Sequence, residues 1–536
     1  MAWLLEDLPE ALRIKLIHGS EGAAHLREAA GLAQEAGLTE LASDLALAAW
    51  GESPLDQAMA GTVAALSGAP SRLRAMARLV SEKVRPPSDL GYYRRLGERR
   101  ESAKMKAYLD RQAEKEPGNL FWASLGLSQA LADADLGQAR RAVQSLPPDL
   151  APLAGFLAGD LAMFQGDPDQ AVEAYARAGQ AGFLPGLELR LGLAHVAGGQ
   201  TGPAETHLRQ ALTQEPWRIS TLLVLHDLIT GADRELRPFP GRVGILLYTF
   251  NKAKDLDQTL ASLADSRLDQ AAQSWLIQVL DNASQDNTGE VLAAWADRLG
   301  PSSFRVITLP VNLGAPGARN WLISLEDTRA CDFTVFLDDD VLLPLDWLSR
   351  LGAAMARYPG AGVWGCRVLD QANPIQIQSA DGFLIPRPGV AGLHDRRFDL
   401  SQGHLHSLCR GQFAYLRPCA TVTGCCHAFA TTTLKAQGGF DLRYSPSQYD
   451  DLDHDIRLLL SGQTPVYQGH LGVRHLKGTG RMGLPGASQY DVGWANQFKL
   501  HHKFSPAQFA QAARTADEAA WADALDKWGK VQNILA

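Results

Sequence analysis

Short apolar runs alternate with helix-like stretches in the second half of the chain, and this alternation restricts the fold more than any other feature. The runs are RVGILLYTF (242–250), SWLIQVLDN (274–282), FRVITLP (304–310) and DFTVFLDDD (332–340). Stretches with apolar residues at helical spacing, such as GEVLAAWADRL, lie between them. Strands that alternate with helices form parallel, doubly wound sheets, which bind ligands beyond the carboxyl ends of their strands. We therefore expect an α/β domain with a mostly parallel, Rossmann-like sheet.

The first half of the chain has a different pattern. Up to about residue 235, apolar residues recur at helical spacing between breaks at Gly, Pro or Asp. GDPDQAVEAYARA (166–178) aligns with GQTGPAETHLRQA (199–211) at an offset of about 33 residues, and a weaker copy begins at Asp135. Small residues where helices cross, with a polar turn ahead of each second helix, describe stacked helix pairs. The pattern resembles the tetratricopeptide repeat over roughly residues 118–232, so we expect an all-α solenoid there.

The segment RELRPFPGR (234–242) separates the two patterns, because two prolines and a glycine interrupt the helical spacing. The expected domains are an N-terminal helical region (1–117), tetratricopeptide-like repeats (118–235), the α/β domain (236–486) and a C-terminal helical extension (487–536). The first region is either divergent repeats or a separate helical cap. The repeats serve either as a spacer or oligomerisation surface, or as a concave surface that binds a peptide or protein.

Charge and hydropathy exclude some classes of function. The net charge of −8 and the lack of a run of basic residues argue against nucleic-acid binding as the main role. The first residues, MAWLLEDLPEALRIKL, interrupt their apolar positions with charges, unlike a signal peptide. Nowhere do about 18 apolar residues run together, the length that a membrane span needs. We therefore expect a cytoplasmic protein without a membrane span.

The six cysteines all lie in the second half and include no CxxC pair. Their positions are 331, 366, 409, 419, 425 and 426. We expect reduced thiols in the core. The alternative is a zinc site formed by Cys409, Cys419, Cys425, Cys426 and His427, although this spacing matches no common zinc-ligand pattern.

Polar side chains follow each of the four apolar runs. They are Thr249 with Asn251, Asp281 with Asn282, the loop NLGAPGARN (312–320) with Arg319, and the acidic triplet Asp338, Asp339 and Asp340. In order and content they resemble the GT-A glycosyltransferases of family 2, in which T-x-N, D-N-x-S and N-x-G-x-x-x-A-R-N precede D-x-D. Taken alone, the polar residues after any one of these runs are equally consistent with a turn or with a solvated strand end.

The resemblance continues downstream and covers about residues 240–480. TGCCHAFATTTLKAQGGFD (423–441) is similar to the acceptor-side strand and helix of that family. YDDLDHDIRLLLSG (449–462) is similar to its E-D-x-D helix start, with Asp450 in place of the usual Glu. PVYQGHLGVRHLKG (465–478) is similar to its terminal strand, which ends in a histidine.

Three adjacent carboxylates repel one another unless a cation offsets their charge, so the triplet predicts Mg²⁺ or Mn²⁺. The resemblance assigns the metal to Asp340, Asp338 and His475, with Asp338 also placed at the ribose or a metal-bound water. Asp339 joins the nucleotide-sugar-binding residues without a defined task. Lys477, directly before a Gly-rich loop (478–486), and Arg481 within that loop are expected to neutralise the diphosphate.

The same resemblance implies the remaining site residues. The expected nucleotide-sugar-binding residues are Thr249, Asn251, Asp281, Asn282, Arg319, Asp338 and Asp339. Asp281 is suited to accept the imide hydrogen of uracil or thymine, and Arg319 to lie near the phosphates or the base. Asp451 is the expected general base, with Asp450 as its substitute. Both acids would also stabilise the amino-terminal end of a helix, which carries a partial positive charge, whether or not they take part in catalysis.

The expected function is that of an inverting, metal-dependent glycosyltransferase. It would move a sugar from a UDP- or dTDP-linked donor to a hydroxyl. Helical repeats joined to such a domain resemble bacterial enzymes that glycosylate Ser or Thr of a protein such as flagellin, and this resemblance implies a protein acceptor. The first alternative is transfer to a lipid-linked or capsular glycan. The second is a repeat scaffold whose transferase domain is inactive.

Overall fold

The computed structural model describes residues 7–387, 392, 396–476 and 487–535. The chain divides into two compact units. Unit 1 comprises Met1–Leu228 together with two short segments, Ala372–Gln376 and Gly403–Gln412. Unit 2 comprises Ile229–Gln371, Ile377–Gln402 and Phe413–Ala536. The sequence pattern did not indicate that short segments beyond residue 370 belong to unit 1.

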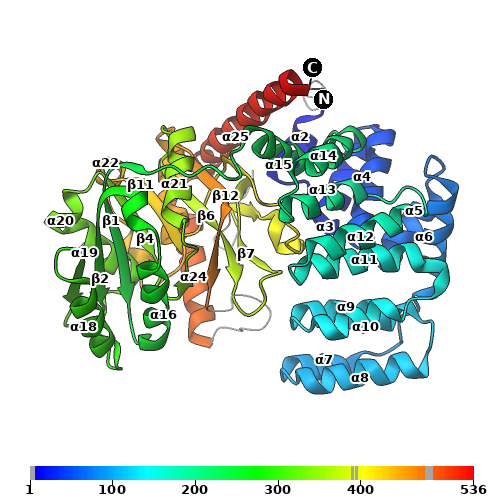
Figure 1. Cartoon of the computed structure of the whole chain (residues 1–536), viewed down its shortest axis with the longest axis horizontal. Helices are drawn as coiled ribbons and strands as arrows, with labels where there is room; N and C mark the ends of the chain where they lie inside the picture. The colour runs from blue at the N-terminus through cyan, green and yellow to red at the C-terminus, as the bar shows by residue number, and fades with distance from the viewer. Residues whose placement is uncertain (1–6, 388–391, 393–395, 477–486, 536) are drawn as a thin grey trace. The chain divides into compact units, whose positions relative to one another are not determined.

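The described part of unit 1 is helical throughout, as expected. Its elements are α2 (Glu10–His18), α3 (Ala23–Glu35), α4 (Thr39–Glu52), α5 (Gln57–Ala65), α6 (Ser71–Lys83), α7 (Gly91–Glu98), α8 (Ser102–Lys115), α9 (Leu120–Ala132), α10 (Leu136–Gln144), η1 (Pro148–Leu150), α11 (Ala151–Phe164), α12 (Pro168–Gly179), α13 (Leu187–Ala197), α14 (Thr201–Gln214), α15 (Ile219–Thr230) and η2 (Gly403–His406). Neighbouring helices pack in pairs, α9 with α10, α11 with α12 and α13 with α14 (Figure 1).

The sequence repeat corresponds to a repeated close contact between paired helices. A Cβ atom added at Gly159 in α11 would lie 2.3 Å from the ring of Tyr175 in α12. Gly192 in α13 and Leu208 in α14 repeat this contact, with 2.7 Å to the Leu208 side chain. Only glycine permits these approaches, because any side chain would overlap the facing one. The assignment to the tetratricopeptide family remains a prediction.

A buried cluster of charged residues lies within unit 1. Arg190 donates to Asp160 at 2.9 Å and lies 3.4 Å from Glu52. Arg218 lies 3.8 Å from Glu52, and Arg410, from the short segment Gly403–Gln412, pairs with both Glu52 and Asp160. Burial would raise the pKa of Glu52, but the three arginines outweigh it and lower that pKa to about 2.

Unit 2 contains the predicted sheet. Its elements are β1 (Phe239–Thr249), α16 (Ala253–Ala264), α17 (Leu268–Ala271), β2 (Ala272–Asp281), α18 (Thr288–Leu299), β3 (Phe304–Thr308), α19 (Gly314–Ser324), α20 (Glu326–Arg329), β4 (Phe333–Leu337), β5 (Val341–Leu342), α21 (Trp347–Arg357), β6 (Val363–Asp370), β7 (Ile377–Ser379), β8 (Phe383–Pro386), β9 (Phe398–Ser401), β10 (Leu416–Pro418), β11 (Cys426–Ala430), α22 (Thr431–Gln437), η3 (Leu442–Tyr444), α23 (Asp450–Leu460), β12 (Pro465–His475), α24 (Ala487–Lys503) and α25 (Pro506–Leu535).

The main sheet has the strand order β10-β12-β6-β11-β4-β1-β2-β3, with β5 paired to β12 and β7 to β6. β4, β1, β2 and β3 are mutually parallel neighbours, and β6 is parallel to β12. β11 runs antiparallel between β4 and β6. The sheet is therefore mixed and mostly parallel. The four strands predicted between residues 242 and 340 are all present, but β4 ends at Leu337 and leaves the acidic triplet beyond it.

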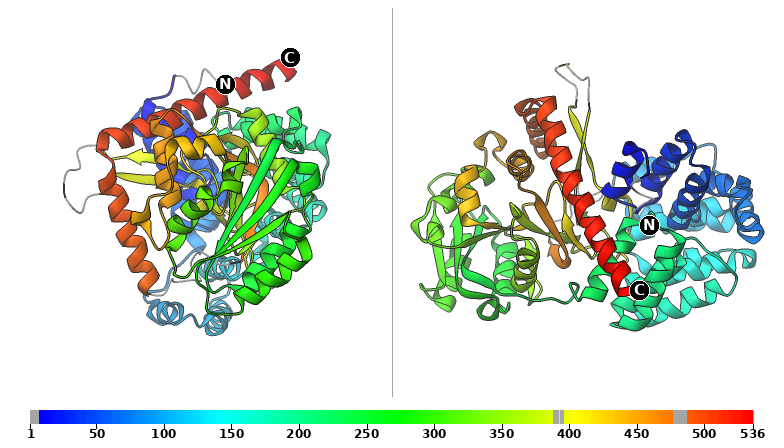
Figure 2. Two further views of the ribbon diagram at one scale, coloured as in Figure 1. Left: turned by 90° about the vertical axis from the view of Figure 1, so that its left-hand side faces the viewer. Right: turned by 90° about the horizontal axis from the view of Figure 1, so that it is seen from above.

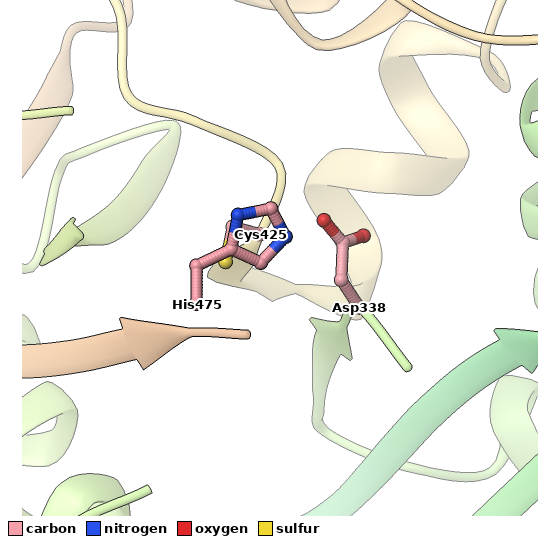
Figure 3. Close-up of side chains that lie close together, drawn as sticks. All are labelled: Asp338, Cys425 and His475. Atoms are coloured by element: carbon pink, nitrogen blue, oxygen red, sulfur yellow. The ribbon is translucent and has the colours of Figure 1, made fainter. Parts of the chain in front are cut away.

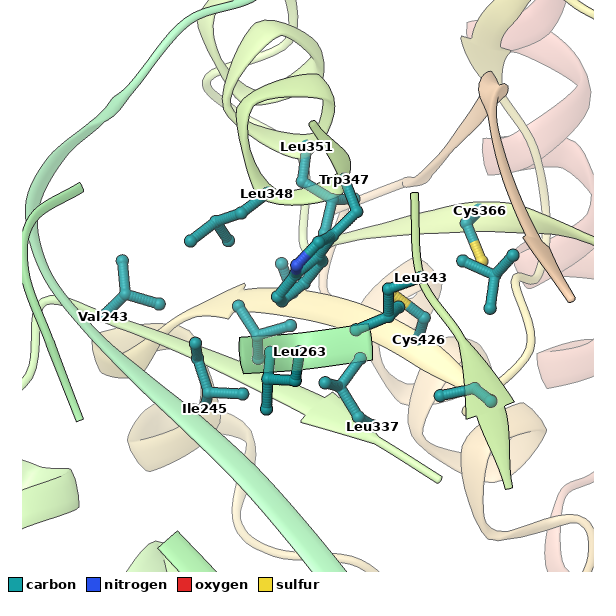
Figure 4. Close-up of a cluster of buried hydrophobic side chains, with 14 of the residues drawn as sticks. Val243, Ile245, Leu263, Leu337, Leu343, Trp347, Leu348, Leu351, Cys366 and Cys426 are labelled. Carbon is teal, nitrogen blue, oxygen red and sulfur yellow. The ribbon is translucent and has the colours of Figure 1, made fainter. Parts of the chain in front are cut away.

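The core of unit 2 lies where helices cover the sheet (Figure 4). Alternate residues of β1, including Val243 and Ile245, point into it together with Leu337 from β4. Trp347 of α21 and Leu263 of α16 cover them, and all five side chains are fully buried. Each such side chain contributes about 1.5–3 kcal/mol through burial. This packing holds the carboxyl ends of β1 and β4 at one edge.

The last two described elements are the helices α24 and α25. α25 is long and packs on α23, β8 and β10, and it is the red helix of Figure 2. Trp494 of α24 is 59% exposed. Among the described residues, no helix combines the length and apolar character needed to cross a bilayer. All six cysteines are free thiols, and five of them are buried.

Two buried histidines make the stability of unit 2 depend on pH. His454 of α23 lies between the rings of Phe429 and Phe440, with centroids 5.2 and 5.1 Å away. Burial lowers the pKa of His454 to about 3 and that of His427 well below its usual range. Unfolded histidine takes up a proton near pH 6.5, so the folded state loses stability as the pH falls below that value.

Acidification from pH 6.5 to 5 is expected to lower the free energy of unfolding by about 2 kcal/mol through His454 alone. Urea unfolding at several pH values measures this loss. His454→Phe should make the free energy of unfolding less dependent on pH, because this variant takes up one proton fewer on unfolding. If the free energy of unfolding depended on pH equally in wild type and in His454→Phe, the role of His454 in this pH dependence would be wrong.

Candidate active site

The carboxyl ends of three parallel strands meet at one edge of the sheet. Leu247 of β1 pairs with Leu337 of β4, and Thr249 of β1 pairs with Asp281 of β2. The side chains that follow these strands therefore gather at that edge, as the topology predicts. Most of the predicted site residues lie there or on the elements packed against it.

The acidic triplet forms the short connection between β4 and β5. β5 pairs with the end of β12, where Val341 lies opposite His475. This pairing brings His475 Nε2 to 2.9 Å from Asp340 Oδ1. The other ring nitrogen, Nδ1, lies 2.8 Å from Gln378 Oε1. Thus the histidine predicted as a metal ligand contacts an acid of the triplet.

Lys252 neutralises two of the three acids. Its Nζ donates to Asp339 Oδ1 at 3.0 Å and to Asp340 Oδ2 at 2.5 Å. Burial would raise the pKa of Asp340, but His475 and Lys252 outweigh it and hold that pKa well below its usual range. Asp339, expected among the nucleotide-sugar-binding residues without a defined task, therefore has Lys252 as a partner, and no role was predicted for Lys252.

Asp338 points to a different set of neighbours. Its Oδ1 accepts a long hydrogen bond from Tyr248, at 3.4 Å, and lies 3.7 Å from Arg319 Nη2. Burial raises the pKa of Asp338 to about 6, because it outweighs the attraction to Arg319.

Asp338, Cys425 and His475 can each direct one ligand atom to a common point. These atoms all lie within 4.8 Å of one another, and Figure 3 shows the three side chains side by side. Burial raises the pKa of Cys425 well above its usual range, so this residue is present as a neutral thiol. The cluster joins Cys425 to an acid and a histidine of the predicted metal site rather than to the other cysteines.

Arg319 of α19 connects the triplet to the start of α23. Its Nη1 donates to Asp450 Oδ2 at 2.6 Å, and its Nη2 donates to the carbonyl oxygen of Gly424 at 3.2 Å. The guanidinium is buried over the ring of Phe440, 5.0 Å from the centroid. Asp450, which stands where the resemblance leads one to expect Glu, thus reaches a charged partner.

Asp451, in the first turn of α23, has a less enclosed carboxylate. Oδ2 accepts from the Gly424 backbone N–H at 2.9 Å and Oδ1 from its neighbour Leu452 N–H at 2.8 Å. The side chain is half-buried, whereas that of Asp450 is 3% exposed. Gly424 therefore links the two acids, with its carbonyl on Arg319 and its N–H on Asp451.

The predicted residues after β1 and β2 hold the two loops together. Asn251, at φ 54°, accepts from the Gln285 backbone N–H at 2.6 Å. Asn282 accepts from Leu313 N–H at 2.8 Å and its own N–H donates to the carbonyl oxygen of Thr249 at 2.9 Å. Asp281 uses Oδ1 to accept from Ser284 N–H at 2.9 Å. These contacts order the loop edge beside β1.

The structure thus brings together two groups of predicted residues through Arg319. One is the triplet with His475, and the other is Asp450 with Asp451. Lys477 and Arg481 lie outside the described residues. No role was predicted for three side chains of the site, namely Lys252, Tyr248 and Gln378, and Cys425 was expected only as a core thiol or a zinc ligand. A single cation directly after the first strand was the available signal for Lys252.

Residues 245–421 match the family model described as glycosyl transferase family 2. The matched part contains Asp281, Arg319 and the acidic triplet, and it ends before Asp450, Asp451 and His475. No curated protein matches the chain.

Among solved structures, the chain is similar to mannosyltransferase PcManGT from Pyrobaculum calidifontis in complex with GDP-Man and Mn²⁺. The identity is 15%, the likeness covers 59% of this chain and 87% of that chain, and the TM-score is 0.35. It is also similar to GalNAc-T7 with UDP, GalNAc and Mn²⁺, at 12% identity over 46% of this chain and 44% of that chain, with a TM-score of 0.34. The family match covers the strand ends at which the site residues gather, and on that ground the chain is a glycosyltransferase.

Proposed function

We propose that this protein is an inverting, metal-dependent glycosyltransferase of the GT-A fold that takes a nucleoside-diphosphate sugar. The observation that carries the proposal is that Arg319 joins a cation-binding group of acids, Asp338 to Asp340, to the acid-bearing start of α23. The first group lies where a diphosphate would be held, and the second supplies a base for the acceptor hydroxyl.

The residues of the first group fit a divalent cation. Asp340, Asp338 and His475 offer carboxylate oxygens and an imidazole nitrogen, and Asp340 already contacts His475 at 2.9 Å. Mg²⁺ and Mn²⁺ prefer oxygen ligands shared between protein and phosphates, which favours them over a metal held by the neutral thiol of Cys425. When bound, such a cation offsets the negative charge that grows on the departing diphosphate.

The nucleotide is placed against the ends of β1 and β2. Asp281 uses one carboxylate oxygen for the Ser284 N–H, and the second is suited to the imide hydrogen of uracil or thymine. Asn251 and Asn282 fix the loops on either side. A UDP-linked hexose or N-acetylhexosamine, or a dTDP-linked sugar, is therefore the proposed donor.

Asp451 is the proposed general base. It is half-buried and accepts hydrogen bonds from the backbone N–H groups of Gly424 and Leu452, whereas Asp450 is buried and paired with Arg319. One carboxylate that removes the acceptor proton while the hydroxyl attacks gives a single displacement, and hence inversion. Asp450 then positions Arg319 and, through it, Asp338.

The acceptor is proposed to be Ser or Thr of a protein such as flagellin, bound by unit 1. A groove of about 980 Å³ lies between α6, α11 and α12, large enough for several side chains of an extended peptide. Small residues line it, including Gly155, Ala174 and Ala178, with Arg72 and Arg177 among the charged ones. A lipid-linked or capsular glycan is the alternative acceptor.

Donor turnover tests the proposed function directly. Hydrolysis of a UDP-linked sugar is expected to require Mn²⁺ and to fall at least about a hundredfold in Asp340→Asn, because the carboxylate that offsets the cation is lost. Thermal shift with UDP- and dTDP-linked sugars identifies the donor. If no nucleotide sugar is bound or hydrolysed with Mn²⁺ present, the chain is a scaffold with an inactive transferase domain.

The acceptor is tested with groove variants rather than by deleting the N-terminal half. Deletion would remove the partners of Gly403–Gln412, which packs within unit 1. Arg72→Glu with Arg177→Glu, both exposed on the groove, is expected to weaken transfer to a protein acceptor about tenfold and leave donor hydrolysis unchanged. Unchanged transfer to protein would indicate that the groove does not bind the acceptor.

A further inference from the structure

Lys252 is held at the acidic triplet by the fold. It is the residue before α16, directly after the turn in which Asn251 adopts φ 54°. Asn251 is fixed at both ends, because its N–H donates to Ser284 Oγ at 2.9 Å and its side chain accepts from Gln285 N–H. The turn therefore directs the Lys252 side chain toward Asp339 and Asp340 rather than into solvent.

Both oxygens of Asp340 are already engaged. Oδ2 accepts from Lys252 at 2.5 Å, and Oδ1 lies 2.9 Å from His475 Nε2. The Asp340 side chain is 2% exposed, so water does not compete freely for these contacts. A cation that used Asp340 as a ligand would compete with these two partners for the same carboxylate. The ammonium of Lys252 is the mobile one, because it is a point charge on a flexible stem.

The ammonium and a divalent cation need the same carboxylates, and close approach of two cations is unfavourable. Displacement of Lys252 therefore requires a new anion within its reach. The diphosphate of the proposed donor is such an anion, and it would arrive at the same edge of the sheet. Phosphate oxygens accept from an ammonium as readily as carboxylates do.

We propose that Lys252 occupies the cation position of the triplet in the free enzyme and transfers to the donor diphosphate when the nucleotide sugar binds. This inference rests on the proposed function. It makes the divalent cation and the nucleotide bind cooperatively, and it gives Asp339 the task of holding Lys252 in the free state. The exchange moves no covalent bond.

The test measures binding of Mn²⁺ alone by electron paramagnetic resonance, and binding of UDP and uridine by calorimetry without metal. Lys252→Met is expected to bind Mn²⁺ at least about tenfold more tightly than wild type, because the competing ammonium is gone. The same variant should bind metal-free UDP several-fold more weakly, with uridine affinity unchanged, because uridine has no phosphate. Lys254→Met, which removes an exposed charge two residues later, should behave as wild type in each experiment.

Tighter binding of Mn²⁺ together with weaker binding of UDP would separate this role of Lys252 from a purely structural one. If Lys252 only stabilised the local fold, the variant would bind both Mn²⁺ and UDP more weakly, and the inference would be wrong. Equal Mn²⁺ affinity in wild type and Lys252→Met would also overturn it. Lys252→Gln, which keeps a hydrogen-bond donor without the charge, provides the same comparison if the Met variant does not fold. If wild type binds neither UDP nor Mn²⁺ separately or together, the proposed function fails as well.

Discussion

Asp451→Asn is expected to lower the rate of sugar transfer by about 10²–10⁴, the usual contribution of a general base. The amide cannot take the proton of the acceptor hydroxyl. It also cannot accept both backbone hydrogen bonds that the carboxylate accepts from Gly424 and Leu452, because its nitrogen is a donor. Single-turnover transfer to the acceptor, with a saturating donor, measures the loss.

The same variant should retain its donor affinity, because the triplet and Asp281 are not altered. Asp450→Asn should differ, since it removes the partner of Arg319 and so disturbs the neighbour of Asp338. Asp265→Asn, at the exposed end of α16, is the matched control and should leave transfer unchanged. Transfer at the wild-type rate in Asp451→Asn, with Asp450→Asn inactive, would move the role of base to Asp450.

The sheet could be predicted because its signals are local. Each of β1 to β4 is a short apolar run. Parallel strands place their carboxyl ends at one edge of the sheet, whichever side chains follow them. The same rule anticipated that Asp281 and Asp338 would lie near that edge. The order of β6, β11 and β12 was not predicted, because antiparallel insertion depends on pairing between residues far apart in the chain.

The partners within the site depend on contacts between distant residues, and composition does not show them. Lys252 reaches acids 87 and 88 residues away, and Arg319 reaches an acid 131 residues away. A lone lysine in a turn is usually solvated, so the sequence offered no reason to pair it with Asp339. His475 lies beside Asp340, and only the resemblance singled out this histidine, whose role as a metal ligand stays a prediction.

The segment Gly403–Gln412 could not be assigned to unit 1 from its sequence for a related reason. CRGQF reads as an ordinary polar loop of the α/β domain, and only the structure shows Arg410 among the acids of unit 1. Burial of an arginine is favourable only where acids are already arranged around it. The helices that carry those acids are more than 200 residues earlier in the chain.

Arg410→Met is expected to destabilise unit 1 by about 3–5 kcal/mol, the cost of breaking a buried ion pair from one side. Arg410 is 5% exposed and pairs with Glu52 and Asp160, whose charges would then be shared by Arg190 and Arg218 alone. Methionine has a similar length, so the loss comes from charge rather than from an empty volume.

Urea unfolding of the full chain measures the effect as a shift of the unfolding transition of unit 1, with helicity as the signal. Arg305→Met is the matched control, because that arginine pairs with Asp327 at 2.9 Å while 52% exposed, and exposed pairs contribute about 0–1 kcal/mol. In the double variant with Glu52→Gln, the loss should be smaller than the sum of the two single losses, since each change removes the charge that the other leaves unpaired. Equal small shifts for Arg410→Met and Arg305→Met would show that the segment Gly403–Gln412 is not anchored through this cluster.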